Sequence, residues 1–254
     1  MSCKDCISGV RIEGTPEGTY QDINGIKTYV ATPTTDHPKD KAILFVTDVF
    51  GHDFVNNALL ADGFARNGFK VYSPDLFEGD PVPPDALNPG SNFDLGKWIP
   101  KHGPEHTGKR VRQVIEALKG QGITVYGATG FCYGARLVFD LAFENIIQVA
   151  VVSHPSFVEA KDLDIYLEKS KAPLLINSCE FDERFPPSLS KTADEKFANF
   201  APGYRRTYFE GVRHGFASRG DLSDPRVKPA KEGAFNASVE WFIKYLKSPL
   251  RAKV

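Results

Sequence analysis

Apolar residues fall into two alternating patterns along this chain of 254 residues: short continuous runs and longer periodic segments. The runs are rich in β-branched and aromatic residues and too continuously apolar for a strand with one wet face, so they predict buried strands. They lie at 27–32, 41–47, 69–73, 123–129, 147–153, 172–178 and 204–209. Helical spacing is found at 54–67, 108–119, 134–145, 188–200 and 230–246. In the last segment, apolar residues fall on one helix face at steps of 4, 3 and 4: Phe235, Val239, Phe242 and Leu246.

Strands that alternate with helices predict an α/β fold, with a mostly parallel sheet and helices on both faces. No repeat, low-complexity tract or linker divides the chain, so we expect an N-terminal extension over 1–18 and one domain over 19–247. One stretch, 76–104, interrupts the alternation and is rich in Pro, Gly and Asp. A connection this long without regular structure either contributes to function at the ligand-binding edge of the sheet or only covers the sheet.

Composition narrows the possible functions. The 31 basic and 32 acidic residues give a net charge of −1 without long blocks of one sign, which argues against a nucleic-acid partner. With 41% hydrophobic and 25% charged residues, the chain resembles an ordinary globular protein. No apolar run approaches the roughly 18 residues of a membrane span, and the N-terminus lacks a secretory signal pattern. We therefore expect a cytoplasmic protein without a membrane partner.

The cysteines predict neither a disulfide framework nor a metal site. There are only four, at Cys3, Cys6, Cys132 and Cys179. The C-x-x-C pair at 3 and 6 has no second pair to complete a set of zinc ligands and no strand before it. A terminus carrying two thiols is the simpler interpretation, and no metal or cofactor is expected.

The strongest chemical signal is residues 130–134 (GFCYG), between a strand-like run and a helix-like run. This is the G-x-nucleophile-x-G elbow with Cys132 in the nucleophile position. Gly130 and Gly134 would avoid Cβ clashes at the sharp turn, and the following helix N-terminus favours a thiolate. The alternative is a buried cysteine between two packing glycines.

A base and an orienting acid should follow such a nucleophile, each after a strand, in the order acid and then histidine. Asp182 and His214 occupy those places, so His214 is the expected general base and Asp182 its partner. Glu180, two residues before Asp182, is the alternative acid. His154 also ends a strand but precedes the acid, so we expect it to line the pocket.

Acyl transfer also needs hydrogen-bond donors for the oxyanion that develops on the carbonyl oxygen. Where a nucleophile elbow is present, one donor is the backbone amide of the residue after the nucleophile, and the other is an amide in the loop after the third strand. These positions predict Tyr133 as the first donor and Val49 as the second. No histidine-and-glycine-rich oxyanion segment is present there. Asp48, at the end of the same strand, is either a structural cap or a carboxylate that reaches the nucleophile.

Together, 47–51 (TDVFG), 130–134 (GFCYG), Asp182 with 185–186 (FP), and 214–216 (HGF) resemble the dienelactone hydrolase family of α/β-hydrolases. The resemblance extends from about residue 19 to the final helix, and 153–157 (SHPSF) and the CKDC opening resemble fungal members. It implies an α/β-hydrolase fold without a separate lid domain and a cofactor-free hydrolase of small lactones or esters.

The resemblance also implies a substrate site formed by Asp48, Phe50, His154 and Arg219. In the family an acid, commonly Glu, stands at the position of Asp48 and contacts the nucleophile, and arginines bind the substrate carboxylate; Arg219 is near one of these positions. Here the acid is one methylene shorter, and no arginine lies between Arg66 and Arg110. These departures leave room for a less acidic ester or lactone.

The leading hypothesis is therefore a monomeric or homodimeric hydrolase that forms a thioester on Cys132. The alternatives are a small-molecule binding protein that retains the pocket without the chemistry, and a thiol-redox role for Cys132 or the terminal pair.

Overall fold

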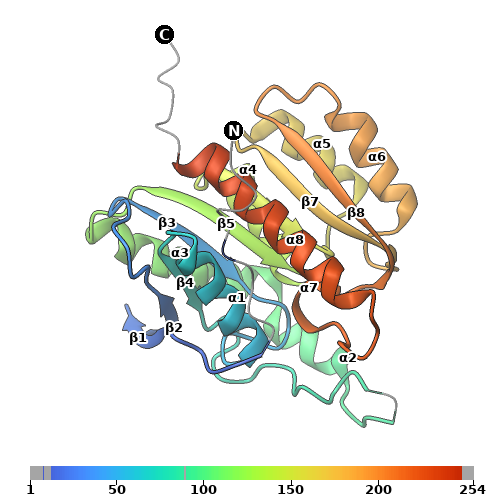
Figure 1. Ribbon diagram of the computed structural model, residues 1–254, viewed down its shortest axis with the longest axis horizontal. Helices are drawn as coiled ribbons and strands as arrows, with labels where there is room; N and C mark the ends of the chain where they lie inside the picture. The colour runs from blue at the N-terminus through green and yellow to red at the C-terminus, as the bar shows by residue number, and fades with distance from the viewer. Residues whose placement is uncertain (1–7, 9–12, 89, 248–254) are drawn as a thin grey trace.

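The computed structural model describes residue 8, residues 13–88 and residues 90–247 (Figure 1). Cys3 and Cys6 lie outside the described residues, as does most of the predicted extension. The described chain forms an eight-stranded sheet in the order β1-β2-β4-β3-β5-β6-β7-β8. Its strands are β1 (Thr19–Ile23), β2 (Ile26–Ala31), β3 (Lys41–Val46), β4 (Val71–Pro74), β5 (Val125–Phe131), β6 (Val149–Ser153), β7 (Leu174–Phe181) and β8 (Tyr204–Arg213).

The sheet is mostly parallel, as the sequence predicts. Only β1 with β2 and β2 with β4 pair antiparallel, whereas every pair from β4 through β8 is parallel. Parallel strands require crossover connections, and helices supply them here. The α-helices are α1 (Val55–Arg66), α2 (Leu95–Trp98), α3 (Pro104–Gly120), α4 (Gly134–Phe143), α5 (Ala160–Lys169), α6 (Pro187–Phe197), α7 (Phe216–Arg219) and α8 (Val227–Phe242), with a 3₁₀ turn η2 (Ile99–His102) and a π turn η3 (Ile243–Lys247).

The helices cover both faces of the sheet. Side chains of α1, α7 and α8 pack into one buried apolar cluster, and those of α3, α4, α5 and α6 pack into another on the opposite face. Both faces of the central strands are therefore buried, which explains their continuous apolar runs. None of the helices in the described ranges combines the length and apolar character needed to cross a bilayer.

Three segments differ from the sequence-based expectation. Strand β1 was not among the predicted runs, since most of its residues are polar and exposed. Helix α5 was not expected either, although Leu163, Tyr166 and Leu167 pack against the core at helical spacing. Its start is marked by a capping box between Glu159 and Asp162. The connection 76–104 is not free of regular structure, since it contains α2 and η2, and the Trp98 indole donates to the Asp80 carbonyl at 2.8 Å.

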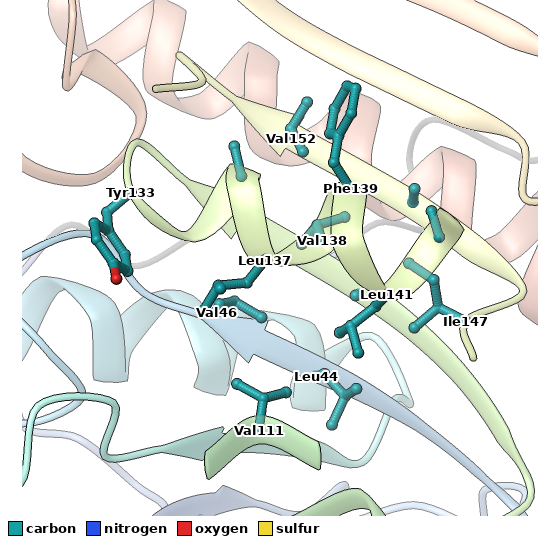
Figure 2. Packing of buried hydrophobic residues seen from close by; sticks show 14 of the residues in the cluster. Leu44, Val46, Val111, Tyr133, Leu137, Val138, Phe139, Leu141, Ile147 and Val152 are labelled. Carbon is teal, nitrogen blue, oxygen red and sulfur yellow. The ribbon is translucent and has the colours of Figure 1, made fainter. Parts of the chain in front are cut away.

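Helix α4, which follows the candidate nucleophile, is fixed against the middle of the sheet. Figure 2 shows Leu137, Val138 and Leu141 of this helix among side chains of neighbouring strands, including Leu44 and Val46 of β3. All three helix residues are at most 1% exposed. Burial of a side chain of this size contributes about 1.5–3 kcal/mol. The start of α4 thus has little freedom to move relative to β3 and β5.

The parallel strands bring distant sequence segments to one edge of the sheet. The carboxyl ends of β3, β5, β6, β7 and β8 meet there, and open α/β sheets bind ligands at this edge. The candidate site residues that directly follow these strands are Asp48, Cys132, His154, Asp182 and His214.

Candidate active site

Cys132 occupies a strained turn between β5 and α4. Its φ of 48° lies in the left-handed region, which non-glycine residues rarely adopt. The flanking glycines allow the close approach that the turn requires. A Cβ on Gly130 would lie 2.6 Å from the Gly134 carbonyl oxygen, and a Cβ on Gly134 would lie 2.1 Å from that of Val46. The strand-to-helix turn has the backbone form of a nucleophile elbow.

The structure brings His214 and Asp182 together beside this elbow. His214 Nδ1 is 2.9 Å from both carboxylate oxygens of Asp182. Asp182 is held in turn by the backbone amides of Arg184 and Phe185, which donate to its Oδ1 at 2.8 and 3.0 Å. The alternative acid is engaged elsewhere, because Glu180 accepts a hydrogen bond from the Gly211 amide at 2.7 Å.

The electrostatics of Cys132 and His214 favour a thiolate–imidazolium pair. Burial raises the pKa of the Cys132 thiol, but the charge and hydrogen bond of His214, with the charge of Arg219, lower it below its ordinary value. Burial lowers the pKa of His214, but the charge on Cys132 and the hydrogen bond to Asp182 raise it to about 9. Each group therefore stabilises the charged form of the other near neutral pH.

The two predicted oxyanion donors follow β3 and β5, which are neighbours in the sheet. In the part of the chain that the structure describes, neither the Val49 amide nor the Tyr133 amide donates a hydrogen bond to another protein group. The Tyr133 side chain is fully buried, donates to the His102 carbonyl and bonds Thr107 Oγ1 at 2.9 Å. The ordered connection 76–104 therefore anchors one of the two candidate donors.

Asp48 is fully buried, and its hydrogen bonds within the described residues are with groups other than Cys132. Its Oδ1 accepts from the Phe50 amide at 3.2 Å and from Asn57 Nδ2 at 3.0 Å, and its Oδ2 accepts from Ser218 Oγ at 2.8 Å. Within the described residues, no hydrogen bond joins this carboxylate to the Cys132 sulfur. The arrangement matches the structural-cap interpretation of Asp48.

A buried lysine that was not predicted from the sequence lies near this carboxylate. Lys231 of α8 is 2% exposed, and its Nζ donates to the Ser218 carbonyl at 2.9 Å. Burial lowers the pKa of Lys231 to about 8, although the charge of Asp48 opposes that decrease. Lysines are rarely buried unless paired, and only the position of Lys231 four residues before Phe235, on the apolar face of the predicted helix, could have indicated its burial.

Arg219 lies over Phe50 at the same edge. Its guanidinium carbon is 5.4 Å from the Phe50 ring centroid, and its Nε is 4.0 Å from Asp48 Oδ2. The Nε itself is buried and has no hydrogen-bond partner among the described residues. The expected positions of Phe50 and Arg219 near the nucleophile are therefore compatible with the fold.

His154 and Ser156 complete the surroundings of His214. The His154 ring is fully buried, 4.9 Å from the His214 ring centroid, and burial lowers its pKa well below the ordinary value. Ser156 Oγ lies 3.4 Å from Cys132 Sγ and 3.5 Å from His214 Nε2. The sequence predicted His154 as a pocket residue but did not indicate Ser156, although both lie in the segment 153–157 (SHPSF).

Comparison with known proteins identifies the family of this chain. The family model described as "Dienelactone hydrolase family" matches residues 26–246. The chain belongs to the dienelactone hydrolase family. Among curated relatives of this dienelactone hydrolase family member, the hydrolase pyvD of Aspergillus violaceofuscus is 36% identical over 243 residues, covering 95% of this chain and 96% of the relative.

Two further comparisons agree. Dienlactone hydrolase 1 of Gibberella moniliformis is 32% identical over 242 residues, covering 93% of this chain and 91% of the relative. A crystal structure provisionally named a dienelactone hydrolase, from Klebsiella pneumoniae, superposes with a TM-score of 0.71 at 18% identity, covering 90% of this chain and 98% of the other. At that identity the superposition supports the α/β-hydrolase fold alone.

Proposed function

We propose that this dienelactone hydrolase family member cleaves small lactones and carboxylic esters through a thioester on Cys132. The Cys132 thiolate attacks the carbonyl carbon, and the carbonyl electron pair moves onto oxygen, where the Val49 and Tyr133 amides donate to it. When the intermediate collapses, the C–O bond breaks and the leaving alkoxide takes a proton from His214 Nε2.

Hydrolysis of the thioester reverses these roles. His214, now neutral, removes a proton from a water molecule whose oxygen forms a bond to the acyl carbon. The second intermediate expels the thiolate, which restores the thiolate–imidazolium pair. The carboxylic acid product gives its remaining proton to solvent and leaves as the carboxylate. Asp182 holds the imidazole in one tautomer and stabilises its protonated form in both halves of the reaction.

One observation carries the proposal. His214, 82 residues after Cys132 in the sequence, has one ring nitrogen 2.9 Å from Asp182 and the other 3.5 Å from a hydroxyl that contacts Cys132 Sγ. Acyl transfer needs a nucleophile, a base near it and an acid that orients the base, and these three groups lie in that order here. A buried structural cysteine requires none of these neighbours.

The decisive experiment combines a variant with mass spectrometry. Cys132→Ala should abolish turnover of p-nitrophenyl acetate, and the wild-type protein should gain an acetyl group on the peptide that contains Cys132. The matched control is Cys179→Ala, since Cys179 is also a buried free thiol, but burial raises its pKa to about 12. Full turnover by Cys132→Ala would refute the mechanism. Ligand-dependent thermal stabilisation without an adduct would instead indicate a binding protein.

A second experiment addresses the charge of the substrate. The Arg219 side chain is 19% exposed at the edge of the sheet that holds Cys132, and guanidinium groups bind carboxylates well. We expect esters with a free carboxylate to be cleaved with a higher kcat/KM than neutral esters of the same size, and Arg219→Ala to remove that difference. Equal values for both esters in the wild-type protein would contradict this role of Arg219.

A further inference from the structure

The segment after β6 is attached directly to the nucleophile elbow. The Cys132 amide donates to the Ser153 carbonyl at 3.1 Å, and the Ser156 amide donates to the Cys132 carbonyl at 2.9 Å. On either side of Ser156, His154 and Phe157 adopt left-handed φ values of 39° and 58°. Such conformations persist only where the surrounding structure enforces them. The Ser156 side chain is therefore fixed relative to the Cys132 sulfur.

The Ser156 hydroxyl lies between the two groups that would exchange a proton. Its oxygen is 3.4 Å from Cys132 Sγ and 3.5 Å from His214 Nε2, and the residue is only 4% exposed. A serine hydroxyl has one proton to donate and two lone pairs that accept. It can donate its proton to the thiolate, while its oxygen stays within reach of the His214 Nε2–H, which also bonds the sulfur.

The neutral pair gains less from the same hydroxyl. A thiol is a weak acceptor and a weak donor, and hydrogen bonds to ionised groups are about twice as strong as those between neutral ones. A hydroxyl in this position therefore shifts the equilibrium toward the thiolate and imidazolium.

We propose that Ser156 is a catalytic residue whose hydroxyl donates a hydrogen bond to the Cys132 thiolate, both in the resting enzyme and when the thiolate leaves during thioester hydrolysis. This inference rests on the proposed function. In the second intermediate, the electron pair of the breaking C–S bond returns to sulfur, and the Ser156 proton faces that developing charge. No proton is transferred to or from Ser156, so His214 still performs each proton transfer.

The test measures ionisation of Cys132 rather than ester turnover. Carbamidomethylation of the Cys132 peptide by iodoacetamide is followed by mass spectrometry as a function of pH, which separates it from reaction at Cys3 and Cys6. We expect Ser156→Ala to move the midpoint of the rate profile upward by about one pH unit, because the variant lacks a donor to the charged form. Ser156→Thr, which retains the hydroxyl, should keep the midpoint close to the wild-type value.

Two further variants make the test decisive. Ser178→Ala removes a hydroxyl that is equally buried but bonds the Thr207 carbonyl and Arg206, so its profile should match the wild type. Ser156→Gly removes the hydroxyl by a second route, in case the alanine variant does not fold. An unchanged midpoint in both folded Ser156 variants, or an equal shift in Ser178→Ala, would overturn the inference. Failure of the proposed function would appear separately, as ester turnover that survives in Cys132→Ala.

Discussion

Replacement of the nucleophile by serine should change the ionisation of a histidine far along the chain. In the wild-type protein, the charge on Cys132 and the hydrogen bond to Asp182 raise the pKa of His214 to about 9 against the effect of burial. A serine hydroxyl does not ionise near neutral pH, so Cys132→Ser removes the charge and retains the shape. We expect the pKa of His214 to fall.

The size of the decrease follows from simple electrostatics. Two unit charges about 4 Å apart interact by about 4 kcal/mol at an effective dielectric constant of 20, which corresponds to about three pH units. The His214 side chain is 15% exposed, so water screens part of this interaction. The pKa of His214 should therefore fall by between about one and three units.

The assay is an NMR titration of protein labelled with ¹³C at histidine Cε1, where only six signals are expected. His214→Gln identifies the signal of interest. The matched control is Cys179→Ser, because Cys179 Sγ lies 3.9 Å from Asp182 Oδ2 but burial raises the pKa of this thiol to about 12, so it carries no charge to lose. An unchanged midpoint in Cys132→Ser, or an equal decrease in Cys179→Ser, would refute the ion-pair reasoning.

The same pKa values predict how stability depends on pH. Because the pKa of His214 is about 9 in the folded protein and near 6.5 when unfolded, its contribution to stability is complete below pH 6.5 and is lost as pH rises toward 9. Cys132 has the opposite dependence, because its pKa is lower in the folded protein than in the unfolded chain. Its contribution to stability is present above the ordinary pKa of a thiol and is lost as the pH falls through the lowered pKa.

Three further variants test the site and the core. Asp182→Asn should lower the kcat of ester hydrolysis by about 10³–10⁴-fold, because the amide no longer holds the reactive tautomer of His214; a loss smaller than tenfold would argue against its role. Gly134→Ala should lower the free energy of unfolding in urea by at least about 2 kcal/mol, since the added Cβ would lie 2.1 Å from the Val46 carbonyl oxygen, and an unchanged midpoint would show that the elbow can relax. Phe139→Ala should cost about 3–5 kcal/mol in the same measurement, because its ring is fully buried, and a loss below 1 kcal/mol would show that α4 repacks.

Much of the fold was predictable because its signals are local. Continuous apolar runs identified the central strands, and the order of Cys132, Asp182 and His214 after those strands placed them at one edge of a parallel sheet. The glycines at 130 and 134 indicated the sharp turn, because a Cβ at either position would clash with nearby backbone, as the structure shows. The expected extent of the domain stays a prediction.

One part that escaped prediction depends on tertiary packing, whereas two others had local signals that were missed. Ser156 is an ordinary residue in the sequence, and it gains its place only because β6 pairs with β5 and two backbone hydrogen bonds attach its loop to Cys132. Lys231 lies four residues before Phe235, on the helix face that the apolar residues mark, so its spacing was a readable sign of burial that its charge obscured. Helix α5 was missed although Leu163, Tyr166 and Leu167 follow helical spacing, so both this short pattern and its capping box were readable.

Three non-glycine residues near the site, Cys132, His154 and Phe157, have left-handed backbones, and each such conformation costs about 1–3 kcal/mol. Packing in the rest of the molecule must offset that energy, so the sheet and α4 hold this part of the site in a strained conformation. Efforts to make the protein more heat-resistant should therefore begin on remote surfaces such as α6. A substitution that relieved the backbone strain at these residues is expected to raise the melting temperature and to lower kcat.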